Sequence, residues 1–148
     1  MNASISLGEL QSAYRRTSSR IYRILEDGYD FSAEDALIEA LNRDALIIDA
    51  AFFVLIFGQM ENRINELAAR KMATDQKRRA LREQKFERRM NIALSGQDNK
   101  TVRDDIEGWY YLRNDAAHGE RLARYNIEAV FERANQLDAM LMGQSEAP

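Results

Sequence analysis

The chain lacks cysteine, and its 148 residues include only one histidine, one tryptophan and one proline. Without cysteine there is no disulfide and no thiolate ligand for a metal, as is typical of cytoplasmic proteins. A zinc site would need mostly carboxylate ligands, which zinc rarely accepts, so we expect no metal site. The only proline is Pro148, so the preceding residues contain no strong helix breaker. These absences favour a cytoplasmic, all-α protein.

The chain also lacks long hydrophobic runs and the sequence patterns of common enzymes. Its most apolar stretch, Ala45 to Gly58, is interrupted by Asp49 and is shorter than the roughly 20 residues that span a bilayer. The first residues have neither a basic start nor an apolar signal segment. No P-loop, Rossmann glycine pattern or nucleophile elbow is present. We expect no membrane association and no cofactor, and interpret Ala45–Gly58 as a buried helix.

Hydrophobic residues make up 45% of the chain, enough for one domain with a proper core. Their helical spacing predicts a single-domain bundle of five or six helices over residues 1–148. Gly28 is expected to end the first helix, and Asn126 to cap the last one. The sequence leaves open whether the segment 33–41 continues into the helix 43–71 or is kinked near Asn42.

Charge is unevenly distributed along the chain, whose net charge is −3. From Arg70 to Arg89 there are nine Lys or Arg and three Asp or Glu, a local balance of +6, within a predicted helix of about residues 75–94. Such a helix can bind RNA phosphates by releasing counterions, although a solvated helix with paired charges is an equal alternative. The candidate phosphate contacts are Arg78, Arg79, Arg82 and Arg89.

The only histidine, His118, lies in the sequence LRNDAAHG at residues 112–119. A helix turns by about 100° per residue, so Asn114 lies one turn before His118 and Arg113 one turn before Ala117. The three polar residues are expected to share one broad face, which the small alanines leave open. Gly119 suits the left-handed residue that ends a helix, which would place His118 in the last turn.

Arg113, Asn114, His118 and Gly119 resemble the signature of the HEPN superfamily, all-α domains of toxin–antitoxin systems, abortive-infection proteins and CRISPR-associated ribonucleases. The stretch 52–67, FFVLIFGQMENRINEL, is similar to a family helix that ends in a polar residue near the Arg–His pair. The resemblance covers about residues 43–142. Glu61 is the best candidate for a carboxylate that orients Arg113. The alternatives are an ordinary surface role for Glu61, or the same task for Asn62 or Asn65.

An Arg–His pair can cleave RNA without a metal. The 2′-hydroxyl attacks the phosphate, so a base, an acid and a cation are needed, and the product carries a 2′,3′-cyclic phosphate. His118 would transfer protons, Arg113 would bind the phosphate, and Asn114 would hold the imidazole or a phosphate oxygen. One chain supplies one histidine, so a symmetric homodimer is expected, and HEPN ribonucleases form composite sites at such interfaces.

The sequence therefore predicts a metal-independent endoribonuclease that acts on RNA as a toxin or phage-defence effector, with a possible antitoxin protein as partner. Alternatives are a non-catalytic HEPN-like module or an antitoxin or regulator, binding RNA, a nucleotide or a protein. Some family toxins carry a modified tyrosine two residues after the histidine, where this chain has Glu120. The identity of any antitoxin therefore stays open. The aromatic residues 109–111 are interpreted as core, with base stacking as the alternative.

Overall fold

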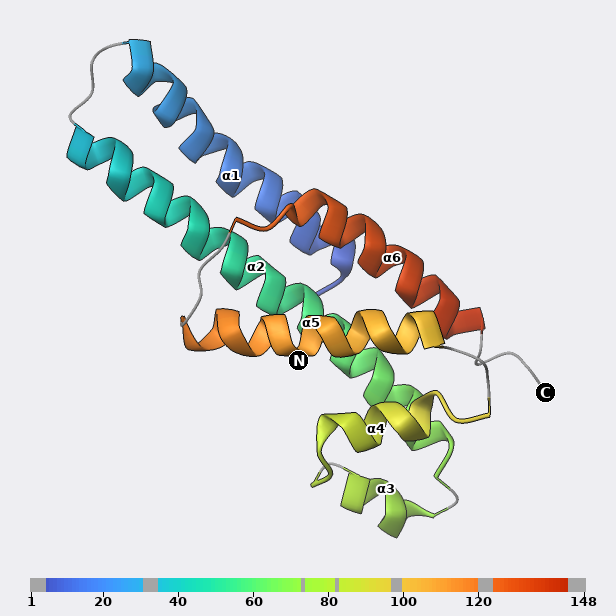
Figure 1. The fold of residues 1–148 in the computed structure, drawn as a ribbon. Coiled ribbons are helices and arrows are strands. Elements are labelled where there is room, and N and C mark those ends of the chain that lie inside the picture. Colours follow the sequence, from blue (N-terminus) through green and yellow to red (C-terminus); the bar gives the residue numbers. More distant parts are fainter. Residues whose placement is uncertain are drawn as a thin grey trace.

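The computed structural model describes residues 5–30, 35–72, 74–81, 83–96, 100–119 and 124–143. These ranges contain six helices and no strand, so the predicted all-α bundle of five or six helices is confirmed (Figure 1). The helices are α1 (Leu7–Asp30), α2 (Asp35–Arg70), α3 (Asp75–Leu81), α4 (Phe86–Ala93), α5 (Lys100–His118) and α6 (Ile127–Gly143).

The longest helix, α2, is the centre of the structure. It packs against each of the other five helices, and α1 also packs against α6. In Figure 1, α5 crosses α2, α6 lies beside α1, and α3 and α4 lie near the C-terminal end of α2. The helix runs without interruption through Asn42, so the segment 35–41 belongs to α2 and no kink separates it from the apolar part.

The core is formed by apolar side chains from all six helices. The largest fully buried side chains are Phe53, Phe57, Phe131, Ile56, Met60, Ile64, Met90, Leu94, Ile106, Ile127, Leu137 and Leu141. The stretch Ala45–Gly58 contributes to this core along one face, whereas Ile47 and Leu55 on its other face are about half exposed. The expectation of a buried helix here is therefore correct for one face only.

Two predicted helix ends are confirmed by their local geometry. Gly119 has a φ of +67°, and its N–H donates to the carbonyl of Ala116 at 3.3 Å, so α5 ends at His118. At the start of α6, the side-chain oxygen of Asn126 accepts a hydrogen bond from the N–H of Ala129 at 3.2 Å. Gly119 therefore fixes the end of α5, which carries the LRNDAAHG segment, and Asn126 fixes the start of α6.

Two other boundaries differ from the expectation. The helix α1 continues past Gly28 to Asp30, since a glycine weakens a helix by only about 1 kcal/mol relative to alanine. The predicted basic helix is divided into α3 and α4, with Lys85 in an extended conformation between them. Leu81 and Phe86 are both buried, but on a continuous helix they would point about 140° apart. The break allows both to face the core.

Candidate functional site

Arg113 lies on α5 with its guanidinium against aromatic rings and a carboxylate. Its terminal carbon is 5.3 Å from the ring centre of Phe57 and 5.4 Å from that of Tyr110, so both rings attract the cation. Its Nη2 donates to Oε2 of Glu61 at 3.4 Å. The contact expected between Glu61 on α2 and Arg113 is therefore present.

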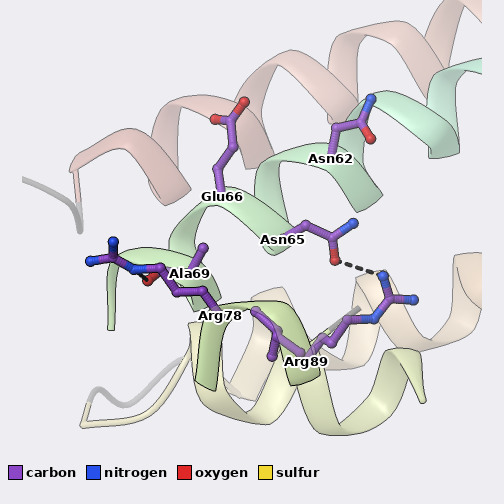
Figure 2. A pocket seen from close by; sticks show the side chains of 7 residues that line it. Asn62, Asn65, Glu66, Ala69, Arg78 and Arg89 are labelled. Carbon is purple, nitrogen blue, oxygen red and sulfur yellow. Dashed lines mark hydrogen bonds between the residues drawn. The ribbon is translucent and has the colours of Figure 1, made fainter. Parts of the chain in front are cut away.

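Glu61 has a second and closer arginine partner. Nη2 of Arg89, on α4, donates to Oε1 of Glu61 at 2.9 Å, and Nη1 of Arg89 donates to Oδ1 of Asn65 at 2.8 Å (Figure 2 shows the latter bond). Glu61 and Asn65 lie one turn apart on α2, so they present two acceptors to one guanidinium. We call Glu61, Asn65, Arg89 and Arg113 the Arg–Glu cluster. From the sequence, Arg89 is expected to contact a phosphate, and its pairing with Glu61 is not predicted.

The Arg–Glu cluster carries two positive charges and one negative charge. The side chains of Arg89, Glu61 and Arg113 are 16%, 24% and 26% exposed, so solvent screens their charges less than at an open surface. Glu61 therefore leaves an excess positive charge at the edge of α5. Such a partly buried excess attracts an anion, and a guanidinium matches the oxygens of a phosphate.

His118 lies at the exposed end of α5, beside a mainly apolar groove. The groove has a volume of about 660 Å³ and runs between α2 and α5. It is lined by Ile47, Ala50, Ala51, Val54, Leu55, Ala116, Ala117, His118 and Gly119. Both alanines of the LRNDAAHG segment line this groove next to the histidine; Ala117 is exposed, whereas Ala116 is buried and belongs to the core.

The structure gives Arg113 and His118 different surroundings within one chain. Arg113 contacts Glu61 and the rings of Phe57 and Tyr110, whereas His118 lines the groove. The two residues are five positions apart, so their side chains leave the helix about 140° from each other. The expectation of one shared face thus fits Asn114 with His118, one turn apart, better than it fits Arg113.

The aromatic residues before the Arg–His segment divide between core and surface. Trp109 packs edge-on against Phe53 with 5.9 Å between ring centres, and Tyr110 stacks on Phe86 at 4.9 Å. Tyr111 is 62% exposed and lies two turns before His118 on the same face of α5. The interpretation as core is thus correct for the first two, whereas Tyr111 is exposed, one turn before the half-buried Asn114.

The arginines predicted to contact RNA have different environments. Arg78 donates from Nε to the carbonyl of Ala69 at 3.2 Å and from Nη1 to Asp75 at 3.1 Å, and Arg79 is exposed. Arg82 lies outside the described residues. A cavity of about 560 Å³ between α2, α3 and α4 is lined by Asn62, Asn65, Glu66, Ala69, Arg78, Leu81 and Arg89 (Figure 2). Arg78 and Arg89 thus border the same cavity. Within the Arg–Glu cluster, the guanidinium of Arg89 is already bound by Glu61 and Asn65.

A second polar cluster joins α1 and α2 around a buried carboxylate. Asp49 is 2% exposed, and its carboxylate accepts hydrogen bonds from the Tyr14 hydroxyl at 2.9 Å and from Nε of Arg124 at 3.1 Å. Arg124 also donates to the Tyr22 hydroxyl. Burial and the bond to Asp49 raise the pKa of Tyr14. In the sequence, this cluster is indicated only by Asp49, the single charged residue within the apolar stretch Ala45–Gly58. The sequence does not reveal the partners of Asp49.

Among the described residues, no group of three or more histidine, aspartate and glutamate side chains is arranged to hold a metal ion. Within the same residues, no helix combines the length and the apolar character needed to cross a membrane. Comparisons with protein-family models, with curated proteins and with solved structures find no match. The HEPN resemblance therefore stays a prediction from the residues quoted above.

Proposed function

We propose that the protein is a metal-independent endoribonuclease of the HEPN type, acting as a toxin or phage-defence effector in the cytoplasm. The observation that carries the proposal is the arrangement of Arg113, whose guanidinium is oriented by Glu61 and by two aromatic rings in a cluster with excess positive charge. An exposed histidine ends the same helix. A phosphate-binding cation and a proton-transfer group on one helix suit cleavage by the 2′-hydroxyl.

Each residue has a role that its chemistry allows. Arg113 stabilises the negative charge that develops on the phosphate, since it uses only part of its hydrogen-bonding capacity on Glu61. His118 transfers protons at the 2′-hydroxyl or at the leaving 5′-oxygen. Asn114 holds the imidazole or a phosphate oxygen. Tyr111, exposed on the same face, provides a flat surface on which a base can stack.

A homodimer completes the site, because one chain supplies one histidine while the reaction needs an acid and a base. The groove beside His118 supports a second copy as its occupant. Ile47, Ala51 and Leu55 lie one turn apart along its wall, forming an apolar stripe on α2. Gly58 continues this stripe, and a Cβ added there would meet no atom within 4 Å in its own chain. A twofold contact along this stripe would bring both His118 side chains to one cleft.

A non-catalytic binding module is the second candidate. It is favoured by one observation, the separate surroundings of Arg113 and His118 within the chain. In that case the excess positive charge of the Arg–Glu cluster would bind RNA without cleaving it. The two functions differ in whether His118 is needed for any chemical change in the RNA.

Cleavage of a single-stranded RNA by the wild type and by His118→Ala, both in EDTA, tests the proposal. We expect the wild type to release 2′,3′-cyclic phosphate ends, and His118→Ala to be slower by roughly 10²- to 10⁴-fold because proton transfer is lost. Arg113→Ala should be slower by about 10²- to 10³-fold, like an enzyme that loses a donor to developing charge. In cells, both variants should relieve growth arrest caused by the wild type.

Arg23→Ala is the matched control, because it removes an exposed positive charge on α1. It should cleave like the wild type. Cleavage by His118→Ala at the wild-type rate, or cleavage by the wild type only with a divalent metal, would contradict the proposal. RNA binding by a folded wild type without cleavage of any tested substrate would favour the binding module.

A further inference from the structure

The two carboxylate oxygens of Glu61 are shared between two arginines at unequal distances. Oε1 lies 2.9 Å from Nη2 of Arg89, and Oε2 lies 3.4 Å from Nη2 of Arg113. Hydrogen bonds between a guanidinium and a carboxylate usually measure about 2.7–2.9 Å. Glu61 is therefore bound closely by Arg89 and only loosely by Arg113.

Arg89 is held in place from several sides. Nη1 donates to Oδ1 of Asn65 at 2.8 Å, and the guanidinium carbon lies 5.7 Å from the ring centre of Phe86 (Figure 2 shows the bond to Asn65). Its side chain is the least exposed of the three charged members of the Arg–Glu cluster. A guanidinium fixed in this way keeps Oε1 of Glu61 occupied.

Without Arg89, the nearest described cation to Glu61 would be Arg113. A carboxylate and a guanidinium prefer to pair through two parallel hydrogen bonds, and a carboxylate that is 24% exposed needs a compensating charge. Glu61 would then turn both oxygens toward Arg113 and neutralise it. In the present arrangement Arg113 uses one of its five N–H groups on Glu61 and keeps the others for a ligand.

We infer that Arg89 is a positioning residue, which occupies one oxygen of Glu61 and thereby leaves Arg113 free to bind the phosphate that is cleaved. The inference rests on the proposed ribonuclease function. It gives Arg89 a task inside the protein in place of a direct contact with RNA. The same arrangement explains why a second arginine lies beside Glu61, although one would neutralise the carboxylate.

The test is the rate of RNA cleavage by variants of Arg89 and Glu61, with kcat and KM measured separately. Arg89→Gln should lower kcat on the order of 10-fold or more, because Glu61 then captures Arg113 and misplaces it. Adding Glu61→Gln to this variant should restore part of the lost kcat, since the amide oxygen can still accept one hydrogen bond from Arg113 but a neutral amide cannot neutralise it through two oxygens. A purely structural role for Arg89 would lower the stability of Arg89→Gln, measured by urea unfolding, and leave the kcat of its folded fraction unchanged.

Asn65→Ala is the second variant, in case Arg89→Gln does not fold. It removes one anchor of Arg89 without changing any charge and should lower kcat in the same direction, while Arg23→Ala should leave kcat unchanged. A wild-type kcat in both Arg89→Gln and Asn65→Ala, or no rescue by Glu61→Gln, would overturn the inference and leave the ribonuclease proposal intact. A wild type that does not cleave RNA would overturn both.

Discussion

Asp49 shows how one residue in the sequence can indicate a structural feature without defining it. A charge within the most apolar stretch requires partners, because an unpaired buried carboxylate is very costly. The partners, Tyr14 and Arg124, come from helix α1 and from the segment before α6, 35 and 75 positions away. Local patterns do not encode such distant pairings, so the sequence displays the isolated charge but neither its burial nor the residues that compensate it.

The raised pKa of Tyr14 leads to a prediction about the stability of the protein at alkaline pH. Because its pKa is raised in the folded protein, the free energy of unfolding should fall as the pH rises above about 10, where tyrosines of the unfolded chain lose their protons. Tyr14→Phe should cost about 1–2 kcal/mol at neutral pH through the lost hydrogen bond to Asp49, and should weaken this alkaline decrease. Urea unfolding at neutral and alkaline pH measures both effects. Tyr111→Phe, at an exposed position, should change neither, and an unchanged alkaline slope in Tyr14→Phe would contradict the assignment.

Among the helices, α5 is predicted best and the basic segment least well. The end of α5 depends on Gly119, a local signal that the sequence displays directly. The division between α3 and α4 depends instead on burying both Leu81 and Phe86 against α2, which is a tertiary requirement. The pairing of Arg89 with Glu61 has the same origin, because it depends on how α4 packs on α2.

The basic surface of α3 leads to a prediction for RNA binding. Replacing Arg78 and Arg79 by alanine should reduce the slope of log Kd against log salt by about 1.4, since each phosphate contact with a single strand contributes about 0.7. Titration of a fluorescent RNA at several salt concentrations measures this slope. The charge-matched control is Arg16→Ala with Arg23→Ala on α1, which should leave it unchanged. An unaltered slope in the α3 variant would mean that α3 is only solvated.

For the whole molecule, the central prediction is the homodimer. Leu55→Glu places a charge in the groove beside His118 and should convert the dimer into a folded monomer without ribonuclease activity, because the proposed site needs both chains. Sedimentation at micromolar concentration and the cleavage assay measure the two effects together. Ile24→Glu is the matched control, since Ile24 on α1 is similarly exposed at 48% against 47% for Leu55. A monomeric wild type would contradict the composite site.

The central position of α2 also bears on how the molecule opens. Each of the other helices packs against α2, so exposing its middle requires most of the structure to separate, and its amide protons should exchange with solvent only through global unfolding. The seven-residue helix α3 packs mainly against α2 and can open while the rest stays intact. The basic surface of α3 therefore lies on a segment that we expect to open more readily than the middle of α2. If an RNA strand binds there, α3 should adjust to it at lower cost than the residues around Arg113.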